Sequence, residues 1–250
     1  MTQSDLSAHL AEFEKNGAVI VERLLTEEVI QRVYDQAGDV MDQSLMAVGA
    51  DVSRFPSGNE KYLYLRDHHP KLKSHCYDIF KRLDSVVCAL TQPFILKFVQ
   101  EILGRTVIFD GAQIRLLDPE NERFYPIHQE FGQISEANVT CWVALSDIPA
   151  GAGGLRIVPG SHRKGTLEHR FLPEHLNYHA VVEHELKGRE IRELTFAKGD
   201  ALFFHPHLLH GSAPNQTRKL RWSLIGRYND VRHVPYLKDE AAPIAIPQVG

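Results

Sequence analysis

Two widely separated stretches carry side chains that could hold a metal ion. The first is Tyr125-Pro126-Ile127-His128-Gln129-Glu130, and the second is His210-Gly211-Ser212-Ala213-Pro214-Asn215. If His128 and Glu130 lie on an extended strand, their side chains point to the same face, because strand side chains alternate. A third ligand, His210, would come from a distant strand. Two imidazoles and one carboxylate suit iron(II) and leave coordination positions free for small molecules.

The spacing of His128 and Glu130 is weak evidence by itself. The chain has 14 histidines and 32 Asp and Glu among 250 residues, so chance would place a carboxylate two positions after roughly one or two of them. The alternative is a histidine at a strand edge beside a solvated glutamate. His205 and His207 could also serve as ligands, but alternation puts them on one face and His210 out of phase unless a bulge intervenes. We favour His210 because of the motif that follows it.

The composition is that of an ordinary globular protein. Of the 250 residues, 43 % are hydrophobic and 24 % are charged, which allows a sizeable core in a single domain spanning 1–250. The net charge of −4 creates no overall positive field that would attract nucleic acid or an anionic membrane. We therefore expect a small-molecule substrate, with no nucleic-acid or membrane partner. The sequence does not indicate an oligomeric state.

The cysteines indicate a reducing environment. Cys76, Cys88 and Cys141 lack close pairing, so neither a disulfide framework nor a cysteine zinc site is expected. The first residues lack a basic segment followed by an apolar run, and no window approaches the apolar length of a spanning helix. We expect a cytoplasmic location.

Residues 1–105 are predicted to be mainly helical support. A strand at 18–21 interrupts the helical patterns, which fall at 4–16, from Thr26 onward, at 70–83, and from Thr91-Gln92-Pro93 to Gly104. Residues 43–66 show no clear period, so a long loop is expected there, with a short strand at 62–65. Such loops are often lids or binding loops, although a plain connector is an equal alternative.

Residues 106–230 are predicted to form a β core. Short β-rich runs are separated by Gly, Pro and Asn turns; they lie at 107–109, 113–117, 139–145, 155–158, 191–196, 201–204 and 221–228. We expect a mainly β fold in which the flanking N-terminal helices buttress one sheet of a jelly roll. Residues 231–250 are expected to be a C-terminal tail.

Several ordered motifs of the β half resemble one enzyme family. The run from Trp142 to Pro149, a glycine-rich loop, and the run from Gly154 to Gly165 resemble the phytanoyl-CoA dioxygenase family of iron(II)- and 2-oxoglutarate-dependent oxygenases. His128-Gln129-Glu130 resembles the first metal motif of that family. The second stretch, with Arg221 and Arg227-Tyr228, resembles its last. The resemblance is weak before residue 107 and strong after residue 125.

The resemblance implies a double-stranded β-helix (a cupin-like jelly roll) with a metal at one mouth. It implies metal ligands at His128, Glu130 and His210, although the family more often has aspartate where Glu130 stands. It further implies Arg221 as the partner of the distal carboxylate of 2-oxoglutarate. The other expected site residues are Ser212 as a hydroxyl donor to that carboxylate, Gln113 as a hydrogen-bonding residue for the cosubstrate, and Trp142 as a wall.

The expected activity is that of a 2-oxoglutarate-dependent dioxygenase that uses Fe(II), 2-oxoglutarate and O2. Hydroxylation of a small organic substrate would accompany conversion of 2-oxoglutarate to succinate and CO2. The alternatives are a cupin-like binding protein without turnover and a zinc or manganese enzyme on the same barrel. Arg221 disfavours the binding protein, because a non-catalytic barrel has no need of a buried arginine facing the metal.

Two further features have open interpretations. Residues 151–154 are glycine-rich, but no P-loop lysine follows, so a hairpin connection is expected rather than a phosphate site. A basic cluster is either a solvated rim or a site for an anionic substrate group, and it contains His162, Arg163, Lys164, His169 and Arg170. We expect substrate specificity to lie in 43–66 and 163–190.

Overall fold

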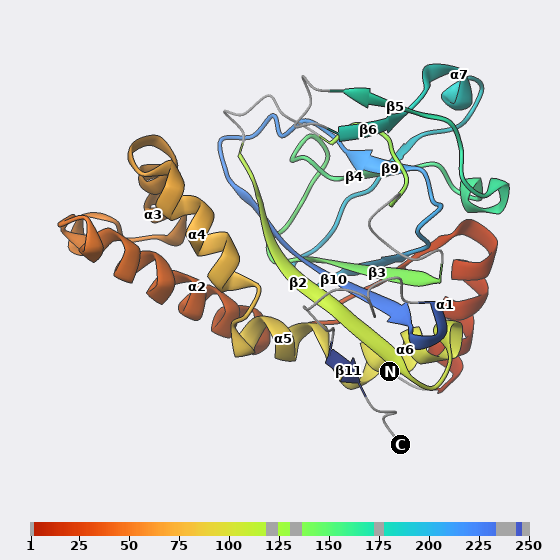
Figure 1. Ribbon diagram of the computed structural model, residues 1–250, viewed down its shortest axis with the longest axis horizontal. Coiled ribbons are helices and arrows are strands. Elements are labelled where there is room, and N and C mark those ends of the chain that lie inside the picture. Colours follow the sequence, from red (N-terminus) through yellow and green to blue (C-terminus); the bar gives the residue numbers. More distant parts are fainter. Residues whose placement is uncertain (1–2, 119–124, 131–136, 173–177, 234–243, 247–250) are drawn as a thin grey trace.

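The computed structural model describes residues 3–118, 125–130, 137–172, 178–233 and 244–246, and shows helices packed against a two-sheet β structure (Figure 1). Most helices lie before residue 107 and most strands after it, although β1 (Ala18–Val21) lies in the helical half and α7 (Glu183–Leu186) in the β half. This confirms the expected fold class. The change from helix to sheet falls between Leu103 and Val107.

The N-terminal helices begin and end at recognisable signals. Helix α1 (Gln3–Asn16) ends at Gly17, whose φ is 74°. Thr26 caps α2 (Glu27–Ala47) through its side chain, and Gln92-Pro93 opens α6 (Pro93–Leu103). The other helices described before the β half are the short 3-10 helix η1 (Val52–Arg54), α3 (Gly58–His68), α4 (Pro70–Phe80) and α5 (Asp84–Leu90).

The loop and short strand expected within 43–66 are wrong. Helix α2 continues to Ala47 because Met41 and Leu45 extend its buried stripe, and α3 spans Gly58–His68 where the strand was expected. Ser57 and Glu60 form a capping box at the start of α3, each side chain accepting a hydrogen bond from the other residue's backbone N–H.

The larger sheet has the strand order β1-β8-β3-β10-β2-β11. Its members are β1 (Ala18–Val21), β8 (Ala201–Phe204), β3 (Asn138–Ala144), β10 (Arg221–Asp230), β2 (Val107–Leu117) and β11 (Ile244–Ile246). The two runs expected at 107–109 and 113–117 are therefore one strand, with Gly111 (φ 100°) inside it. The expected C-terminal tail contributes the edge strand β11.

The smaller sheet has the order β7-β4-β9, and the segment 125–130 adds to it through a bridge between His128 and His210. Its strands are β7 (Arg192–Glu193), β4 (Leu155–Ile157) and β9 (His210–Ser212). A hairpin of β5 (His169–Leu172) and β6 (Tyr178–Val181), followed by α7 (Glu183–Leu186), occupies much of 163–190.

Two of the three hydrophobic cores in the described chain share strand β3. The first lies between the helices and the outer face of the larger sheet, where Val139, Cys141 and Val143 of β3 contact the helical layer. The second lies between the sheets and includes Trp142 and Ala144 of the same strand. Strand β3 is buried on both faces, so its alternate side chains serve both cores.

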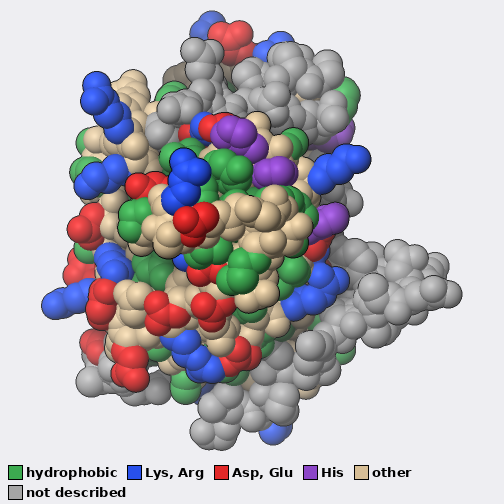
Figure 2. All heavy atoms as spheres, turned by 90° about the vertical axis from the view of Figure 1, so that its left-hand side faces the viewer, with side chains coloured by type: hydrophobic (Ala, Val, Ile, Leu, Met, Phe, Trp, Pro, Cys, Tyr) green, Lys and Arg blue, Asp and Glu red, His purple; other side chains and the backbone are tan. Residues whose placement is uncertain are grey.

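No single helix in the described part of the chain is long and apolar enough to cross a membrane; the bent pair α5–α6 meets those criteria only when its two helices are taken together. On the face that carries α2 and α3, acidic and basic side chains are intermixed (Figure 2).

Candidate active site

Three potential metal ligands meet at one end of the space between the sheets. His128 and His210 are cross-strand neighbours: each backbone N–H donates to the other's carbonyl oxygen, at 2.8 and 2.9 Å. The N–H of Glu130 donates to Pro206 O at 2.9 Å, which extends the pairing. One ligand atom from each of the three side chains lies within 4.8 Å of the other two. Their convergence comes from the backbone pairing.

Gly211 permits this close pairing. A Cβ atom at this position would lie 2.7 Å from the carbonyl oxygen of Tyr125 and 2.8 Å from that of Pro126. Backbone oxygens held in a sheet cannot retreat from such a contact. A glycine after His210 therefore lets the segment 125–130 approach β9.

Both imidazoles present Nε2 to the site. Nδ1 of His128 lies 2.7 Å from Pro126 O, and Nδ1 of His210 lies 2.9 Å from Leu208 O. A carbonyl oxygen can only accept, so each Nδ1 carries the proton and each Nε2 keeps its lone pair. Burial, together with the neighbouring His210, lowers the pKa of His128 to about 3, which keeps it neutral. This is the state in which histidine binds metals.

Glu130 is held as a carboxylate by its neighbours. Its Oε1 lies 3.5 Å from Nε2 of His210, and its Oε2 lies 3.3 Å from Nη2 of Arg227 on β10. Burial alone would raise the pKa of Glu130, but the charge of Arg227 is the main influence that outweighs it and holds that pKa below its ordinary value. Glu130 can therefore offer an anionic oxygen at neutral pH.

Gln129 points away from this cluster and holds the surrounding loops. Its Nε2 donates to the carbonyl oxygens of Gly165 and His207 at 2.9 and 2.6 Å, and its Oε1 accepts from the N–H of Leu167 at 2.9 Å. The side chain is buried. Sequence analysis missed this role, although strand alternation between His128 and Glu130 already implied an opposite orientation.

We predict that Gln129→Leu lowers the free energy of unfolding by about 2–4 kcal/mol, because buried donors and acceptors on two loops lose their partner. Urea denaturation measures this. The matched control is Gln31→Leu, which removes an exposed hydrogen bond to Asp35 and should cost about 0.5 kcal/mol or less. Equal losses in the two variants would contradict the role of Gln129.

Arg221 is a buried cation with no acidic partner among the residues that the structure describes. It is 4 % exposed, at the start of β10. Its Nη1 donates to Gly153 O at 2.5 Å, and its guanidinium lies over the ring of Trp142 at 5.4 Å. In the described part of the chain, its Nε has no hydrogen-bond partner. Burial lowers the pKa of Arg221 to about 10. A buried guanidinium in this state matches an anionic ligand.

One small cavity, of about 50 Å³, joins these groups. Its lining includes the three potential ligands together with Arg221, Ser212 and Trp142. Gln113 lies on the inward face of β2, where it pairs with Ile225 of β10, but it does not line this cavity. Its Oε1 is buried without a hydrogen-bond partner among the described residues.

The other histidines near the second stretch lie elsewhere. The ring of His205 is 5.4 Å from that of His162 and 5.3 Å from that of His207, and Nδ1 of His205 accepts from the N–H of His207 at 3.0 Å. Within the described ranges, His128, Glu130 and His210 form the one group of three or more potential ligands whose atoms converge.

Residues 13–223 match the family model described as phytanoyl-CoA dioxygenase. The chain belongs to this family.

The relatives include both mammalian and bacterial enzymes. Bovine peroxisomal phytanoyl-CoA dioxygenase is 24 % identical over 232 residues, covering 87 % of this chain and 66 % of the relative. Thus the chain spans somewhat less than two thirds of the mammalian protein. The 1-deoxypentalenic acid 11-beta-hydroxylase of Streptomyces exfoliatus is 28 % identical, with 75 % of each chain covered. L-proline trans-4-hydroxylase of Streptomyces griseoviridis is 26 % identical over 64 % of this chain and 67 % of that one.

Solved structures confirm the double-stranded β-helix. The epimerase SnoN in complex with Fe3+, alpha-ketoglutarate and nogalamycin RO has a TM-score of 0.67 at 16 % identity, covering 100 % of this chain and 97 % of that one. EctD from S. alaskensis with 2-oxoglutarate and 5-hydroxyectoine has a TM-score of 0.60 at 15 % identity, covering 93 % and 77 %.

The residues present fit the groups that the phytanoyl-CoA dioxygenase family implies. The two unprotonated Nε2 atoms and the Glu130 carboxylate form a donor set suited to iron(II). The unpartnered Nε of buried Arg221 on the same cavity fits the distal carboxylate of 2-oxoglutarate. Glutamate in place of the more common aspartate still reaches the cluster.

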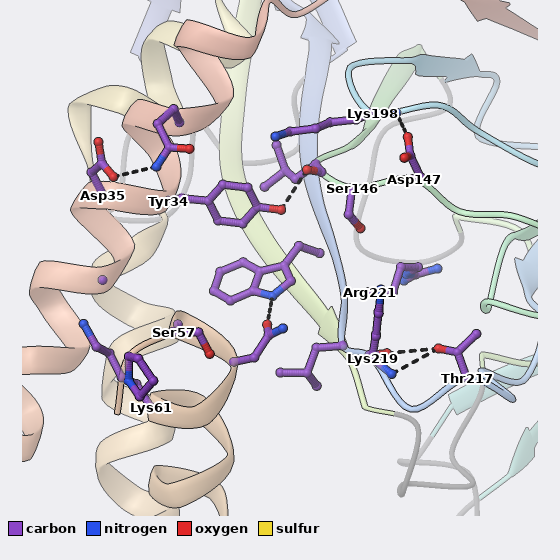
Figure 3. A pocket seen from close by; sticks show the side chains of 18 of the residues that line it. Tyr34, Asp35, Ser57, Lys61, Ser146, Asp147, Lys198, Thr217, Lys219 and Arg221 are labelled. Atoms are coloured by element: carbon purple, nitrogen blue, oxygen red, sulfur yellow. Dashed lines mark hydrogen bonds between the residues drawn. The ribbon is translucent and has the colours of Figure 1, made fainter. Parts of the chain in front are cut away.

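A larger cavity of about 1130 Å³ lies outside the barrel, between α2, α3 and the start of β10 (Figure 3). Its size favours it as a ligand site, but two of its lysines already have acidic partners. Lys61 forms an ion pair with Asp42 at 2.7 Å, and Lys198 pairs with Glu27. The converging donors of the small cavity, rather than volume, locate the chemistry. Arg221 lines both cavities.

Proposed function

We propose that the protein is an iron(II)- and 2-oxoglutarate-dependent dioxygenase that hydroxylates a small organic substrate. The observation that carries the proposal is the buried Arg221, which has no acidic partner in the described ranges and lines the same cavity as two histidines and a glutamate. A metal-binding protein without turnover would bury this charge at a cost and gain nothing from it.

The proposed roles follow from geometry and burial. His128, Glu130 and His210 would hold the metal, and Arg221 with Ser212 would hold the distal carboxylate of 2-oxoglutarate. Trp142 forms the wall beneath the guanidinium, at 5.4 Å. Gln113 would hydrogen-bond the cosubstrate through its buried Oε1 or its amide N–H; that oxygen has no donor in the described chain, although Gln113 does not line the cavity.

Bound iron(II) would couple the reduction of O2 and the decarboxylation of 2-oxoglutarate, giving succinate and CO2, to insertion of one oxygen atom into a substrate C–H bond. The chain orients and shields this chemistry. The Nδ1 hydrogen bonds of the two histidines fix the direction of each ring. Arg227 holds the Glu130 carboxylate from the side. Apolar residues of the inner core, including Phe204 and Leu155, exclude water.

Two relatives are named for hydroxylation of a small organic acid, proline in one case and 1-deoxypentalenic acid in the other. We propose that this chain likewise acts on a small molecule. A reducing, cytoplasmic location is part of the proposal, supported by free Cys76, Cys88 and Cys141.

Anaerobic addition of iron(II) and 2-oxoglutarate tests the proposal. We expect a weak reddish-violet charge-transfer band, followed by succinate when air is admitted. The band requires the 2-oxo acid to chelate the metal, so iron(II) with succinate is the control that should give none. Absence of the band, together with tight zinc binding and no succinate in air, would favour a zinc enzyme on the same barrel.

A further inference from the structure

Arg115 is a second cation on the inward face of β2. It lies opposite Ser223 of β10, while Arg221 lies opposite Leu117, two positions farther along β2. The two arginines therefore occupy neighbouring inward positions of paired strands. Arg115 is partly buried and lines the same cavity as His128, Glu130 and His210. The two guanidiniums are close enough to repel each other. Burial is the larger cause of the lowered pKa of Arg221, and the charge of Arg115 lowers it further.

The protein partner of Arg115 is neutral. Its Nη1 donates to the hydroxyl of Tyr125 at 3.0 Å, and its guanidinium carbon lies 5.6 Å from the centre of that ring. Within the described ranges, no carboxylate forms an ion pair with it. Tyr125 thus fixes the orientation of the Arg115 guanidinium and accepts a hydrogen bond from one of the five N–H groups of that guanidinium. The remaining donors can form a fork for a planar anion.

Positive charges outnumber negative charges around the cavity. Three guanidiniums line it, those of Arg115, Arg221 and Arg227, against the one carboxylate of Glu130 in the described lining. Bound iron(II) and the 2-oxoglutarate dianion would bring the total to five positive and three negative charges. Arg227 already contacts Glu130, and Arg221 would take the distal carboxylate of 2-oxoglutarate. Among the described cations of the cavity, Arg115 is the one left without an anionic partner.

We infer that Arg115 binds a carboxylate of the substrate, so that the substrate is a small organic acid anchored beside the metal. The inference rests on the proposed function and adds the substrate class and a specificity-determining residue. The carboxyl group of 2-oxoglutarate nearest its keto group is committed to the metal in the proposed function, and its other carboxyl group to Arg221. A substrate carboxylate on Arg115 reduces the excess of positive charge around the cavity from two to one and gives Arg115 an anionic partner.

Acetate is a probe small enough to test this site directly. The enzyme is loaded with less than one equivalent of Mn(II), saturated with 2-oxoglutarate, and titrated with acetate while the metal-induced relaxation of the methyl protons is recorded. We expect saturable relaxation with acetate and none with acetamide, its uncharged analogue. In Arg115→Met the dissociation constant for acetate should rise at least about tenfold, because a charge-assisted contact is lost. Arg115→Lys should retain part of the affinity.

The affinity for 2-oxoglutarate, measured on the same samples, should change by less than about twofold in Arg115→Met, well below the loss expected for a charge-assisted contact; its retention also shows that the variant is folded. Three results would overturn the assignment: no acetate binding to the wild type, equal acetate affinity in wild type and Arg115→Met, or a loss of 2-oxoglutarate affinity as large as that of acetate. If the proposed function itself is wrong, the wild type binds no 2-oxoglutarate and shows no charge-transfer band with iron(II).

Discussion

His210→Ala is expected to abolish succinate formation and to weaken iron(II) binding by more than about 100-fold, because loss of a ligand exceeds the 10–100-fold cost of losing a group that only orients one. The remaining pair, His128 and Glu130, cannot form a three-ligand face. Succinate assays and anaerobic iron(II) titration measure the two effects.

His207→Ala is the matched control. His207 lies three positions away on the same segment, but its ring contacts His205 rather than the cluster of potential ligands. Its removal should leave iron(II) affinity within about threefold of the wild type, the scatter expected of a residue outside the site. Loss of iron binding in His207→Ala with retention in His210→Ala would transfer the ligand role to the other histidines.

Arg221→Met is expected to weaken 2-oxoglutarate binding by roughly 10–150-fold, the equivalent of about 1.5–3 kcal/mol for a hydrogen bond to a charged group. The ligand-free protein should lose little stability. The hydrogen bond to Gly153 is lost, but so is the cost of burying an unpaired charge. Methionine also preserves much of the volume beside Trp142.

Thermal unfolding with and without 2-oxoglutarate separates these effects, with a redox-inert metal bound throughout. Wild type should gain stability on adding the cosubstrate, since a ligand that binds only the folded state raises Tm. Arg221→Met should show a similar Tm without it and a much smaller gain with it. An unchanged gain would exclude Arg221 from the cosubstrate site.

The central features of the site could be predicted because they depend on local periodicity. Two-residue spacing is sufficient to put His128 and Glu130 on one face of an extended segment. Bringing His210 to them requires a backbone pairing between segments far apart in the sequence, which only the family motifs indicated. That pairing requires a glycine at position 211, because Tyr125 and Pro126 lie against it. The sequence alone does not show this contact, so the role of Gly211 could not be predicted.

Helix α3 was predictable in principle but missed. Its apolar stripe is short, with Tyr62 and Leu65 buried, and four apolar or aromatic residues in succession suggested a strand. The spacing of Ser57 and Glu60 is the capping-box signal that identifies a helix start. The end of α2 was missed for a related reason, because Met41 and Leu45 continue its stripe beyond the expected stop.

The roles of Arg115 and Tyr125 could not be predicted from the sequence. An arginine on a half-buried strand usually reaches solvent or an acid, and nothing local distinguishes a guanidinium that lies over a phenol from one that does not. The contact depends on β2 lying beside the segment 125–130, which is a property of the assembled barrel. The same holds for Arg227, whose partner Glu130 is distant in sequence.

A crystal structure of the protein grown anaerobically with iron(II) and 2-oxoglutarate tests the central claim most directly. We expect anomalous iron density about 2.0–2.3 Å from Nε2 of His128, Nε2 of His210 and one carboxylate oxygen of Glu130, the range of first-row metal bonds to nitrogen and oxygen. The distal carboxylate of 2-oxoglutarate should lie on the guanidinium of Arg221. Iron bound by His205 and His207, or 2-oxoglutarate bound away from Arg221, would contradict the account.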